Sequence, residues 1–387
     1  MTLLFFSDIP WAGLFQRPQQ LALRLARRYP VLWIEPATLG TKVHWHADRI
    51  AENVHRLTVP QFPYHARNRF VRTFSRMLGS IRPFRFLLLK IQQYLLMRTL
   101  QSLGVNPEEM IVLIQNFQYI RPALHLRPSM ILFDYIDDAF GFTQFPPYVH
   151  GEWEETIRVA DVVTVTATAL RDRIVAAVPR EVHIINNAVE VTQFQNPAGE
   201  RPVDLPTPGR PIAVYVGAIA RWMDLALVRE LCCSLPEVSF VFIGPVHPDI
   251  RPTVDGLRSL QNCHFLGTKP YADVPRYLQH CDAGMIPFVR NTLTSGVNPV
   301  KMYEYSAAGI PTVATLFSDD LLEFGDLIFL AKTRKDFAGQ LQHALALAKD
   351  GRLKEKLRTF AMANDWDTRA ARMASLIGQH LQTTDRR

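Results

Sequence analysis

Short apolar runs alternate along the chain with longer stretches in which apolar residues recur every three to four positions. Short runs fit buried strands and the longer period fits amphipathic helices, so this alternation predicts βαβ units and parallel sheets. In the first half we expect strands at 3–7, 31–35, 110–115, 130–135, 162–166 and 183–186. Helices are expected between them, among others at 17–28 and 151–159.

A segment without periodicity, QNPAGERPVDLPTPGRP at 195–211, separates this half from the next and is typical of a linker. The alternation then restarts, with strands expected at 212–216, 238–243, 263–266, 283–287, 312–314 and 327–330. Helices are expected at 224–234, 274–280 and 299–308, followed by a long helical tail at 335–381. We therefore predict domains at 1–195 and 212–364, a linker at 196–211 and a terminal helix at 365–387. Ligands of two such sheets are expected at their carboxyl ends, in a cleft between the domains.

The composition is that of an ordinary globular protein. Of the 387 residues, 48% are hydrophobic and 20% are charged, which excludes disordered, collagen-like and coiled-coil chains. The four cysteines form no CxxC pair and are too few for a disulfide framework. The amino terminus lacks the basic start of a signal peptide, and no apolar run approaches the ~20 residues of a membrane-spanning helix. We expect a cytoplasmic protein.

The positive charge is concentrated in one part of the chain. Between Asn53 and Pro107 there are nine Lys or Arg residues and no Asp or Glu, whereas the whole chain carries only +7. Because aromatic and leucine residues are interleaved with these charges, the segment can form amphipathic helices that lie on an anionic membrane surface. A solvated basic face over an ordinary core is the alternative. We do not expect nucleic acid as a partner, because no binding motif accompanies the charge.

The segment SGVNPVKMYEYSAAGIPTVAT, 295–315, contains the most specific pattern. Pro299 suits the first turn of a helix, so the amides from Asn298 through Val300 to Lys301 would be unpaired and could bind an anion. Lys301 adds a positive charge suited to a diphosphate, and Glu304 on the same helix face can accept hydrogen bonds from a ribose diol. An exposed i,i+3 charge pair is the structural alternative.

Two adjacent carboxylates, Asp137 and Asp138, follow the expected strand at 130–135. Because adjacent carboxylates repel each other, we interpret one as a catalytic or acceptor-binding group, with helix capping as the alternative. Successive residues point in different directions, so at most one is expected to face a substrate. Near the first strand, Gly13 would allow close backbone approach to an acceptor or a phosphate, and Arg17 would offer positive charge or pair with a surface acid. No metal-binding pattern is found, so we expect metal-independent chemistry without a cofactor.

The motifs VNPVKMYEYSAAGIPTV, SDIPWAGLFQRPQQLALRLA, FDYIDDAFGF, YVGAIARWMDLALVREL and FLGTKPYADVPRYLQHCDAGMIPF resemble those of GT-B glycosyltransferases. The resemblance is to the broad GT4-like group that includes teichuronic-acid and exopolysaccharide enzymes, and it spans nearly the whole chain. It implies an α/β fold of two Rossmann-like doubly wound domains that face a central cleft, with a C-terminal helix crossing back to the first domain.

The resemblance also implies roles for single residues. Glu304 matches the second, ribose-binding Glu of the family's EX7E motif, whereas Gly296 stands at the position of the first. Arg221, after Gly217, lies where the family binds the diphosphate, and Lys301 would supply the second charge. The Gly267–Tyr271 loop lies where the family recognises the nucleobase, on which Tyr271 would stack or, alternatively, would only pack.

These observations predict an enzyme that transfers a sugar from a nucleotide diphosphate sugar, with UDP as the expected nucleotide, to a lipid-linked or cell-envelope glycan at the inner face of the membrane. The missing first Glu and the Asp pair favour inversion, with Asp138 as the first candidate for the base and Asp137 as the second. A nucleotide-sugar 2-epimerase and a catalytically silent binding module of the same fold are the alternatives.

Overall fold

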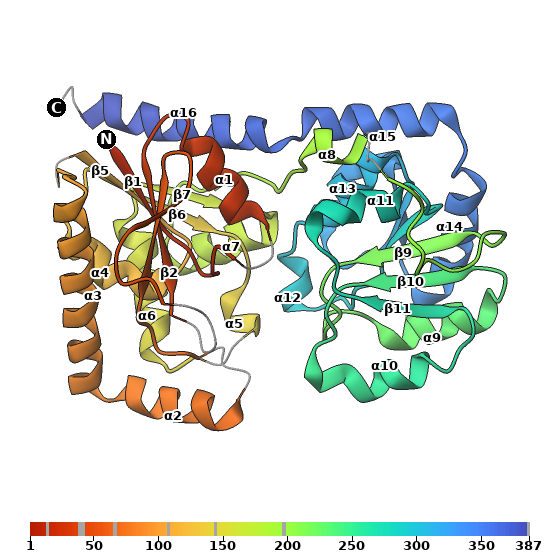
Figure 1. Ribbon diagram of the computed structural model, residues 1–387, viewed down its shortest axis with the longest axis horizontal. Helices are drawn as coiled ribbons and strands as arrows, with labels where there is room; N and C mark the ends of the chain where they lie inside the picture. The colour runs from red at the N-terminus through yellow and green to blue at the C-terminus, as the bar shows by residue number, and fades with distance from the viewer. Residues whose placement is uncertain are drawn as a thin grey trace. The chain divides into compact units, whose positions relative to one another are not determined.

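A computed structural model describes residues 1–12, 15–37, 43–64, 68–106, 109–142, 145–195 and 199–384. The chain forms two compact units, each with its own parallel sheet (Figure 1). Unit 1 comprises Met1–Asn186 and Arg369–Arg387, and unit 2 comprises Asn187–Thr368.

Unit 1 is built on an eight-stranded sheet of order β3-β4-β2-β1-β5-β6-β7-β8. All neighbouring strands are parallel except β3, which is antiparallel to β4. The strands are β1 (Thr2–Phe6), β2 (Val31–Pro36), β3 (Asp48–Ala51), β4 (Val54–Val59), β5 (Met110–Ile114), β6 (Met130–Tyr135), β7 (Val162–Val165) and β8 (His183–Ile184). The central strands are buried on both faces, as uninterrupted apolar runs such as that of β5 require.

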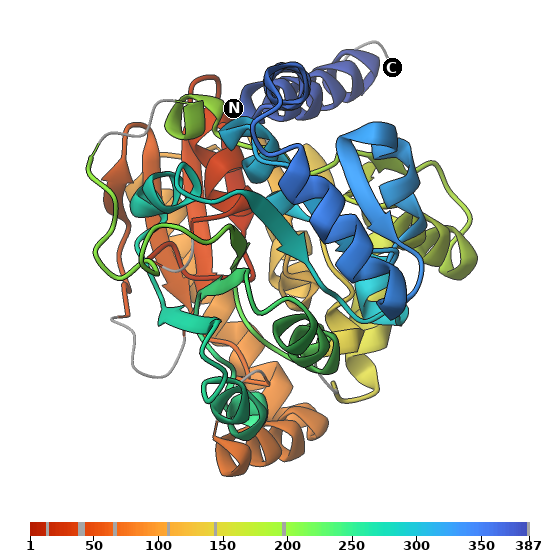
Figure 2. The ribbon, with the colours of Figure 1, turned by 90° about the vertical axis from the view of Figure 1, so that its right-hand side faces the viewer.

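The helices of unit 1 cover this sheet. They are α1 (Arg17–Leu25), α2 (Arg69–Ser80), α3 (Arg82–Ser102), α4 (Ile120–His125), α5 (Ala139–Phe142), α6 (Tyr148–Val159) and α7 (Thr168–Ala177), with a short 3-10 turn η2 (Phe117–Tyr119) before α4. The last helix, α16 (Trp366–Thr384), belongs to unit 1 from Arg369 onward and lies near the amino terminus (Figure 2). Its His380 Nε2 lies 3.5 Å from Asp161 Oδ1.

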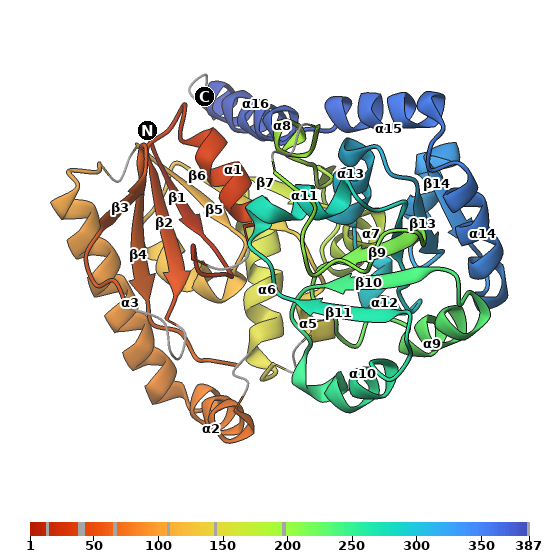
Figure 3. The ribbon, with the colours of Figure 1, turned by 45° about the vertical axis from the view of Figure 1, so that its right-hand side comes forward.

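Helices α2 and α3 meet at an angle at Ile81 and lie along one side of unit 1 (Figure 3). The Asn68 side chain caps α2 by accepting hydrogen bonds from the amides of Phe70 and Val71. Both helices leave large apolar side chains exposed, among them Phe70, Phe74, Met77, Phe84, Phe86, Leu87, Ile91 and Tyr94. The helices expected from the basic segment are therefore present. No helix in the described ranges has both the length and the apolarity needed to cross a bilayer.

Unit 2 contains a six-stranded parallel sheet of order β11-β10-β9-β12-β13-β14 (Figure 3). Its strands are β9 (Ile212–Val216), β10 (Ser239–Ile243), β11 (Cys263–Gly267), β12 (Ala283–Ile286), β13 (Thr312–Thr315) and β14 (Ile328–Ala331). Its helices are α8 (Val191–Gln195), α9 (Leu225–Ser234), α10 (Arg251–Leu257), α11 (Val274–Leu278), α12 (Thr292–Ser295), α13 (Val300–Ala308), α14 (Arg334–Ala346) and α15 (Gly351–Ala363). Short 3-10 segments are η3 (Pro248–Ile250), η4 (Tyr271–Asp273) and η5 (Asp319–Leu327).

The strands and helices expected from the hydrophobic pattern are confirmed to within a few residues, and the α/β class with two parallel sheets is confirmed with them. Strands β3 and β4 were not predicted. They contain Asp48, Arg49, His55 and Arg56, so they lack the uninterrupted apolar run of a central strand. The units divide after Asn186, whereas the linker was expected at 196–211. That proline-rich segment contributes Leu205 to the core of unit 2, and Asp204 accepts a hydrogen bond of 2.9 Å from Tyr277.

Candidate functional site

Three glycines stand at or just beyond the carboxyl ends of the adjacent strands β9, β10 and β11. Gly217, Gly244 and Gly267 have φ angles of +135°, +147° and +73°, which residues other than glycine rarely adopt. The amide of Gly217 donates to Ile243 O at 2.8 Å, and the amide of Gly244 donates to Gly267 O at 2.8 Å. A β-carbon on Gly244 would collide with the carbonyl of Gly217. The three turns therefore pack backbone against backbone at the edge of the sheet where ligands of parallel sheets bind.

Lys301, in the first turn of α13, lies against the turn at Gly217. A β-carbon on residue 217 would lie 2.6 Å from Lys301 Cε and 2.8 Å from its Nζ. The ammonium group is also held over two aromatic rings, with Nζ 5.3 Å from the centroid of Tyr215 and 5.9 Å from that of Phe288. Lys301 thus presents a positive charge at the carboxyl end of β9.

Helix α13 begins at Val300, with Pro299 at the N-cap rather than in the first turn. The first amides of a helix have no acceptor within it, so Val300 and Lys301 contribute the positive end of the helix dipole to this edge of the sheet. Gly309 ends the helix in the left-handed conformation expected of a C-terminal glycine.

Glu304 is buried one turn after Lys301, with only 6% of the residue exposed. Its Oε1 accepts a hydrogen bond of 2.8 Å from Tyr271 Oη. Burial raises the pKa of Glu304, while the nearby Lys301 charge and the Tyr271 hydroxyl act in the opposite direction. Burial and the Glu304 carboxylate together hold the pKa of Tyr271 well above its ordinary value, so Tyr271 is a neutral donor.

The ring of Tyr271 packs edge to face on Phe194, with the two centroids 6.0 Å apart. Gln193 Nε2 donates to the backbone carbonyl of Tyr271 at 3.4 Å. The packing role that the sequence left open for Tyr271 is therefore present in unit 2, and stacking on a nucleobase stays a prediction. Gly267, at the start of the same loop, has open space where a side chain would be.

Asn298 is buried and has partners within unit 2. Its Oδ1 accepts hydrogen bonds from the Asn187 amide at 2.8 Å and from Tyr303 Oη at 3.1 Å, and its carbonyl accepts from Asn187 Nδ2 at 2.7 Å. Because Asn187 is the first residue of unit 2, Asn298 joins the start of the unit to the start of α13. This fixes the orientation of the helix that presents Lys301.

Arg221 follows Gly217 in the turn after β9, and its side chain is 74% exposed. It forms an ion pair with Asp249. Exposed ion pairs contribute little free energy, so a more highly charged phosphate could compete with Asp249 for this guanidinium.

In unit 1, Asp137 and Asp138 point in different directions, as expected. Asp137 is exposed, whereas only 4% of Asp138 is exposed. Asp138 forms an ion pair with Arg173 and accepts a hydrogen bond of 3.4 Å from Tyr135 Oη. The two carboxylates therefore have different surroundings, and which of them accepts a proton stays a prediction.

Arg17 is not available for a phosphate in this structure, which corrects the role expected for it. Only 3% of the residue is exposed, and its Nε and Nη2 donate to the two oxygens of Asp134 at 3.0 and 2.8 Å. Its Nη1 donates to the carbonyls of Ile185 and Asn186 at 2.9 and 3.1 Å. The acid that pairs with Arg17 is thus buried rather than on the surface. Gly13, its expected companion, lies outside the described residues.

Asp134, which the sequence analysis did not single out, is the centre of this network. It is fully buried on β6 and also accepts hydrogen bonds from Gln115 Nε2 at 2.9 Å and Thr164 Oγ1 at 2.7 Å. An Asp within an otherwise apolar strand was the available signal, because a buried carboxylate requires partners. Within the described ranges, no group of three His, Cys, Asp or Glu side chains is arranged to hold a metal ion.

The fold is of the GT-B class. A sucrose-phosphate synthase from Thermosynechococcus elongatus superposes with a TM-score of 0.75 at 15% identity, covering 99% of each chain. Anabaena Alr3699/HepE, in complex with UDP and glucose, superposes with a TM-score of 0.61 at 14% identity, covering 98% of this chain and 99% of that one.

Within this class, residues 210–347 match the family described as Glycosyl transferases group 1. TuaH of Bacillus subtilis (strain 168), whose name assigns it to teichuronic acid biosynthesis as a glycosyltransferase, is 25% identical over 229 residues. The match covers 54% of this chain and 55% of TuaH, so it spans about half the length of that relative. The resemblance to group 1 GT-B glycosyltransferases is therefore confirmed.

Proposed function

We propose that the protein transfers a sugar from a nucleotide diphosphate sugar bound by unit 2. The observation that carries this proposal is the position of Lys301 against the Gly217 turn, with the buried Glu304 one helical turn further on. All three residues lie within 210–347, the part that matches the glycosyltransferase family. The complex of HepE with UDP and glucose supports UDP as the nucleotide.

The proposed chemistry follows from the charges of this site. A departing nucleoside diphosphate gains negative charge as the glycosidic bond breaks, and Lys301 with the first amides of α13 would stabilise that charge. Glu304 would accept hydrogen bonds from the ribose hydroxyls, in competition with Tyr271 for Oε1. Arg221 would bind the distal phosphate after release from Asp249. We propose that these groups replace the metal ion that other transferases use.

For the acceptor, we propose a lipid-linked or cell-envelope glycan bound by unit 1. The name of TuaH, which refers to a cell-envelope polymer, supports this class of acceptor. The exposed apolar side chains of α2 and α3, interleaved with arginines, support peripheral binding to an anionic membrane. We further propose inversion, with Asp137 or Asp138 taking the proton of the acceptor hydroxyl.

Incubation with radiolabelled UDP-, GDP- and TDP-sugars and a crude lipid extract tests the proposal. Transfer of label to the lipid fraction from one donor is the expected result. A free epimerised nucleotide sugar would instead identify an epimerase, and binding of a nucleotide without any product would identify a silent binding module. Either outcome would overturn the proposed function.

Membrane binding is tested separately with vesicles of phosphatidylglycerol and phosphatidylcholine. Replacement of Arg69, Arg72 and Arg76 in α2 by Gln is expected to weaken binding by up to about 1 kcal/mol per charge, most strongly at low salt. The matched control replaces Arg352, Lys354 and Lys356 of α15 by Gln, which removes the same charge from unit 2. Wild-type protein that ignores anionic vesicles would contradict the proposal.

A further inference from the structure

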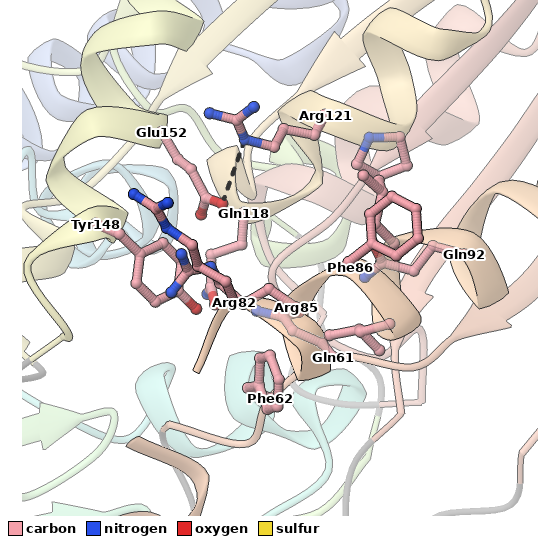
Figure 4. Close-up of a pocket in the computed structure, with 13 residues that line it drawn as sticks. Gln61, Phe62, Arg82, Arg85, Phe86, Gln92, Gln118, Arg121, Tyr148 and Glu152 are labelled. Carbon is pink, nitrogen blue, oxygen red and sulfur yellow. Dashed lines mark ion pairs between the residues drawn. The ribbon is translucent and has the colours of Figure 1, made fainter. Parts of the chain in front are cut away.

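Unit 1 contains a pocket of about 390 Å³ at the carboxyl edge of its sheet, hereafter the α3 pocket (Figure 4). It is lined by Gln61 and Phe62 after β4, by Gln118 of η2, by α3 and by the first turns of α4 and α6. These segments follow the parallel strands β4, β5 and β6, and so converge where such sheets bind ligands. The volume is within the range of small-molecule sites.

Two arginines of α3 bring positive charge to this pocket. Arg82 is exposed, and Arg85 is half-buried with its guanidinium carbon 4.2 Å from the centroid of the Tyr148 ring. Arg85 Nη1 donates to the carbonyl of Gly79 at 2.8 Å. In the described part of the chain, neither arginine forms an ion pair with a carboxylate. Both keep donors for an anionic ligand.

A third arginine, Arg121 of α4, is shared between two carboxylates of α6. Its Nη2 lies 3.1 Å from Glu155 Oε2. Its Nε lies 4.0 Å from Glu152 Oε1, the ion pair drawn in Figure 4. The Glu152 side chain is only 12% exposed. Burial raises the pKa of Glu152 to about 8, although Arg121 and Arg85 act against this. A neutral Glu152 would leave the pocket positive and add one hydrogen-bond donor.

Apolar side chains form much of the remaining lining, which consists of Phe62, Phe86, Leu88, Leu89 and Pro122 together with Gln61, Gln92 and Gln118. Phe86 is itself 62% exposed at the rim. Phe84, Leu87 and Ile91 are also each more than a third exposed, but the helical period places them on the opposite face of α3 from Arg85, Leu89 and Gln92. The apolar surface next to the arginines is therefore that of the pocket's own lining.

We propose that the α3 pocket binds the phosphate group of a phosphorylated single-chain lipid, whose hydrocarbon chain lies against Phe62, Leu88 and Leu89. Arginine guanidinium groups match phosphate oxygens in pairs, and these side chains provide the apolar surface that a free phosphate does not need. The basic segment 53–107, which has no Asp or Glu, complements an anionic ligand and not a cationic ligand. The inference rests on the proposed function in one respect: the lipid-linked acceptor proposed above would carry the same combination of phosphate and hydrocarbon chain.

Direct binding tests the inference without donor or turnover. Decyl phosphate, kept below its critical micelle concentration, is titrated by calorimetry into the full-length protein, alongside decanol and inorganic phosphate. We expect decyl phosphate to saturate one site and to bind at least about tenfold more tightly than either control ligand. Inorganic phosphate that binds as tightly as decyl phosphate would overturn the lipid assignment, and so would decanol that does.

Two variants with equal loss of charge locate the site. The Arg82→Gln, Arg85→Gln variant is expected to bind decyl phosphate about tenfold or more weakly, whereas the Lys90→Gln, Arg98→Gln variant of the same helix is expected to bind it as wild type does. The single Arg82→Gln variant guards against a folding defect, because Arg82 is exposed, and a several-fold loss is expected from it. Equal losses in both double variants would show a diffuse basic surface and overturn the pocket.

UDP affinity separates this inference from the proposed function. All of these variants are expected to bind UDP as wild type does, because the α3 pocket and Lys301 belong to different units. Failure of sugar transfer with intact decyl phosphate binding would contradict the proposed function alone. Transfer without decyl phosphate binding would contradict the pocket alone.

Discussion

Lys301 crosses the backbone of Gly217 so closely that a β-carbon on residue 217 would lie 2.6 Å from Lys301 Cε. The turn after β9 and the start of α13 are therefore fitted to each other, and the glycine is required by its φ of +135° as well as by the lysine. The position of the ammonium group depends on both residues.

The Gly217→Ala variant is expected to lose UDP affinity about tenfold or more, because the new methyl group displaces Lys301. The backbone strain alone costs about 1–3 kcal/mol of stability. Gly209→Ala is the matched control, since Gly209 has a φ of +119° and open space around its missing β-carbon. Thermal unfolding and UDP titration of both variants check this; equal UDP affinities would show that the fit between Gly217 and Lys301 has no role in binding.

Lys301→Met keeps the length of the side chain and removes its charge. If Lys301 stabilises the departing diphosphate, kcat is expected to fall by about 100-fold while KM for the nucleotide sugar changes less. Steady-state kinetics with the nucleotide sugar that serves as donor in the transfer assay measure kcat and KM separately. A rise in KM at constant kcat would mean that Lys301 only anchors the ground state.

Glu304→Ala is expected to weaken nucleotide-sugar binding by about 1–3 kcal/mol, because charge-assisted hydrogen bonds to the ribose are lost. Tyr271→Phe removes the partner of Glu304 Oε1 and leaves the carboxylate in place. Calorimetric titration of both variants with UDP is the measurement. If the two variants lose the same affinity, Glu304 acts only by holding Tyr271.

The adjacent carboxylates of unit 1 differ in burial: Asp137 is exposed, whereas Asp138 is buried and forms an ion pair with Arg173. Asp138→Asn is expected to lower thermal stability, because Arg173 loses its ion pair in a largely buried position. Asp137→Asn is expected to lower turnover about 100-fold if Asp137 is the base of an inverting reaction, and Asp138→Asn is expected to do so if Asp138 is the base. Arg173→Gln serves as the control that breaks the same ion pair without touching a carboxylate. Proton NMR of the product anomer decides the stereochemistry, and a retained anomer with an active Asp137→Asn enzyme would remove the assignment.

Glu152 makes stability depend on pH. Its pKa of about 8 in the folded state exceeds the ordinary value of a glutamate, so the folded state binds the proton more tightly than the unfolded state. The stabilising contribution of the protonated form is present at low pH and is lost as pH rises from about 4.5 to about 8. Glu152→Gln is therefore expected to raise the melting temperature at pH 9 and to change it little at pH 4.

The exposed Glu154 of the same helix provides the control for this pH dependence. Glu154→Gln removes the same charge and is expected to leave the pH profile of unfolding as in wild type. Identical profiles for Glu152→Gln and wild type would show that Glu152 is not the group responsible.

Much of this molecule follows from local sequence. Buried strands such as β5 and β6 are recognisable because apolar residues fill consecutive positions, and α13 because Lys301, Glu304 and Gly309 are spaced within a single helix. The helix itself places Lys301 and Glu304 one turn apart, so their proximity needed no tertiary information. Strands β3, at the edge of the sheet, and β4 beside it were missed for the converse reason, since their polar residues give no comparable signal.

Tertiary structure decided the partners of the functional side chains. Arg17 pairs with Asp134, 117 residues away in sequence, and Asp138 pairs with Arg173, so neither has the free charge that its sequence context indicated. The contact of Lys301 with Gly217 and the convergence of several segments at the α3 pocket likewise depend on which strands are neighbours. Hydrophobic periodicity determines which face of an element is buried, but the order of strands in a sheet determines which side chains from distant elements meet.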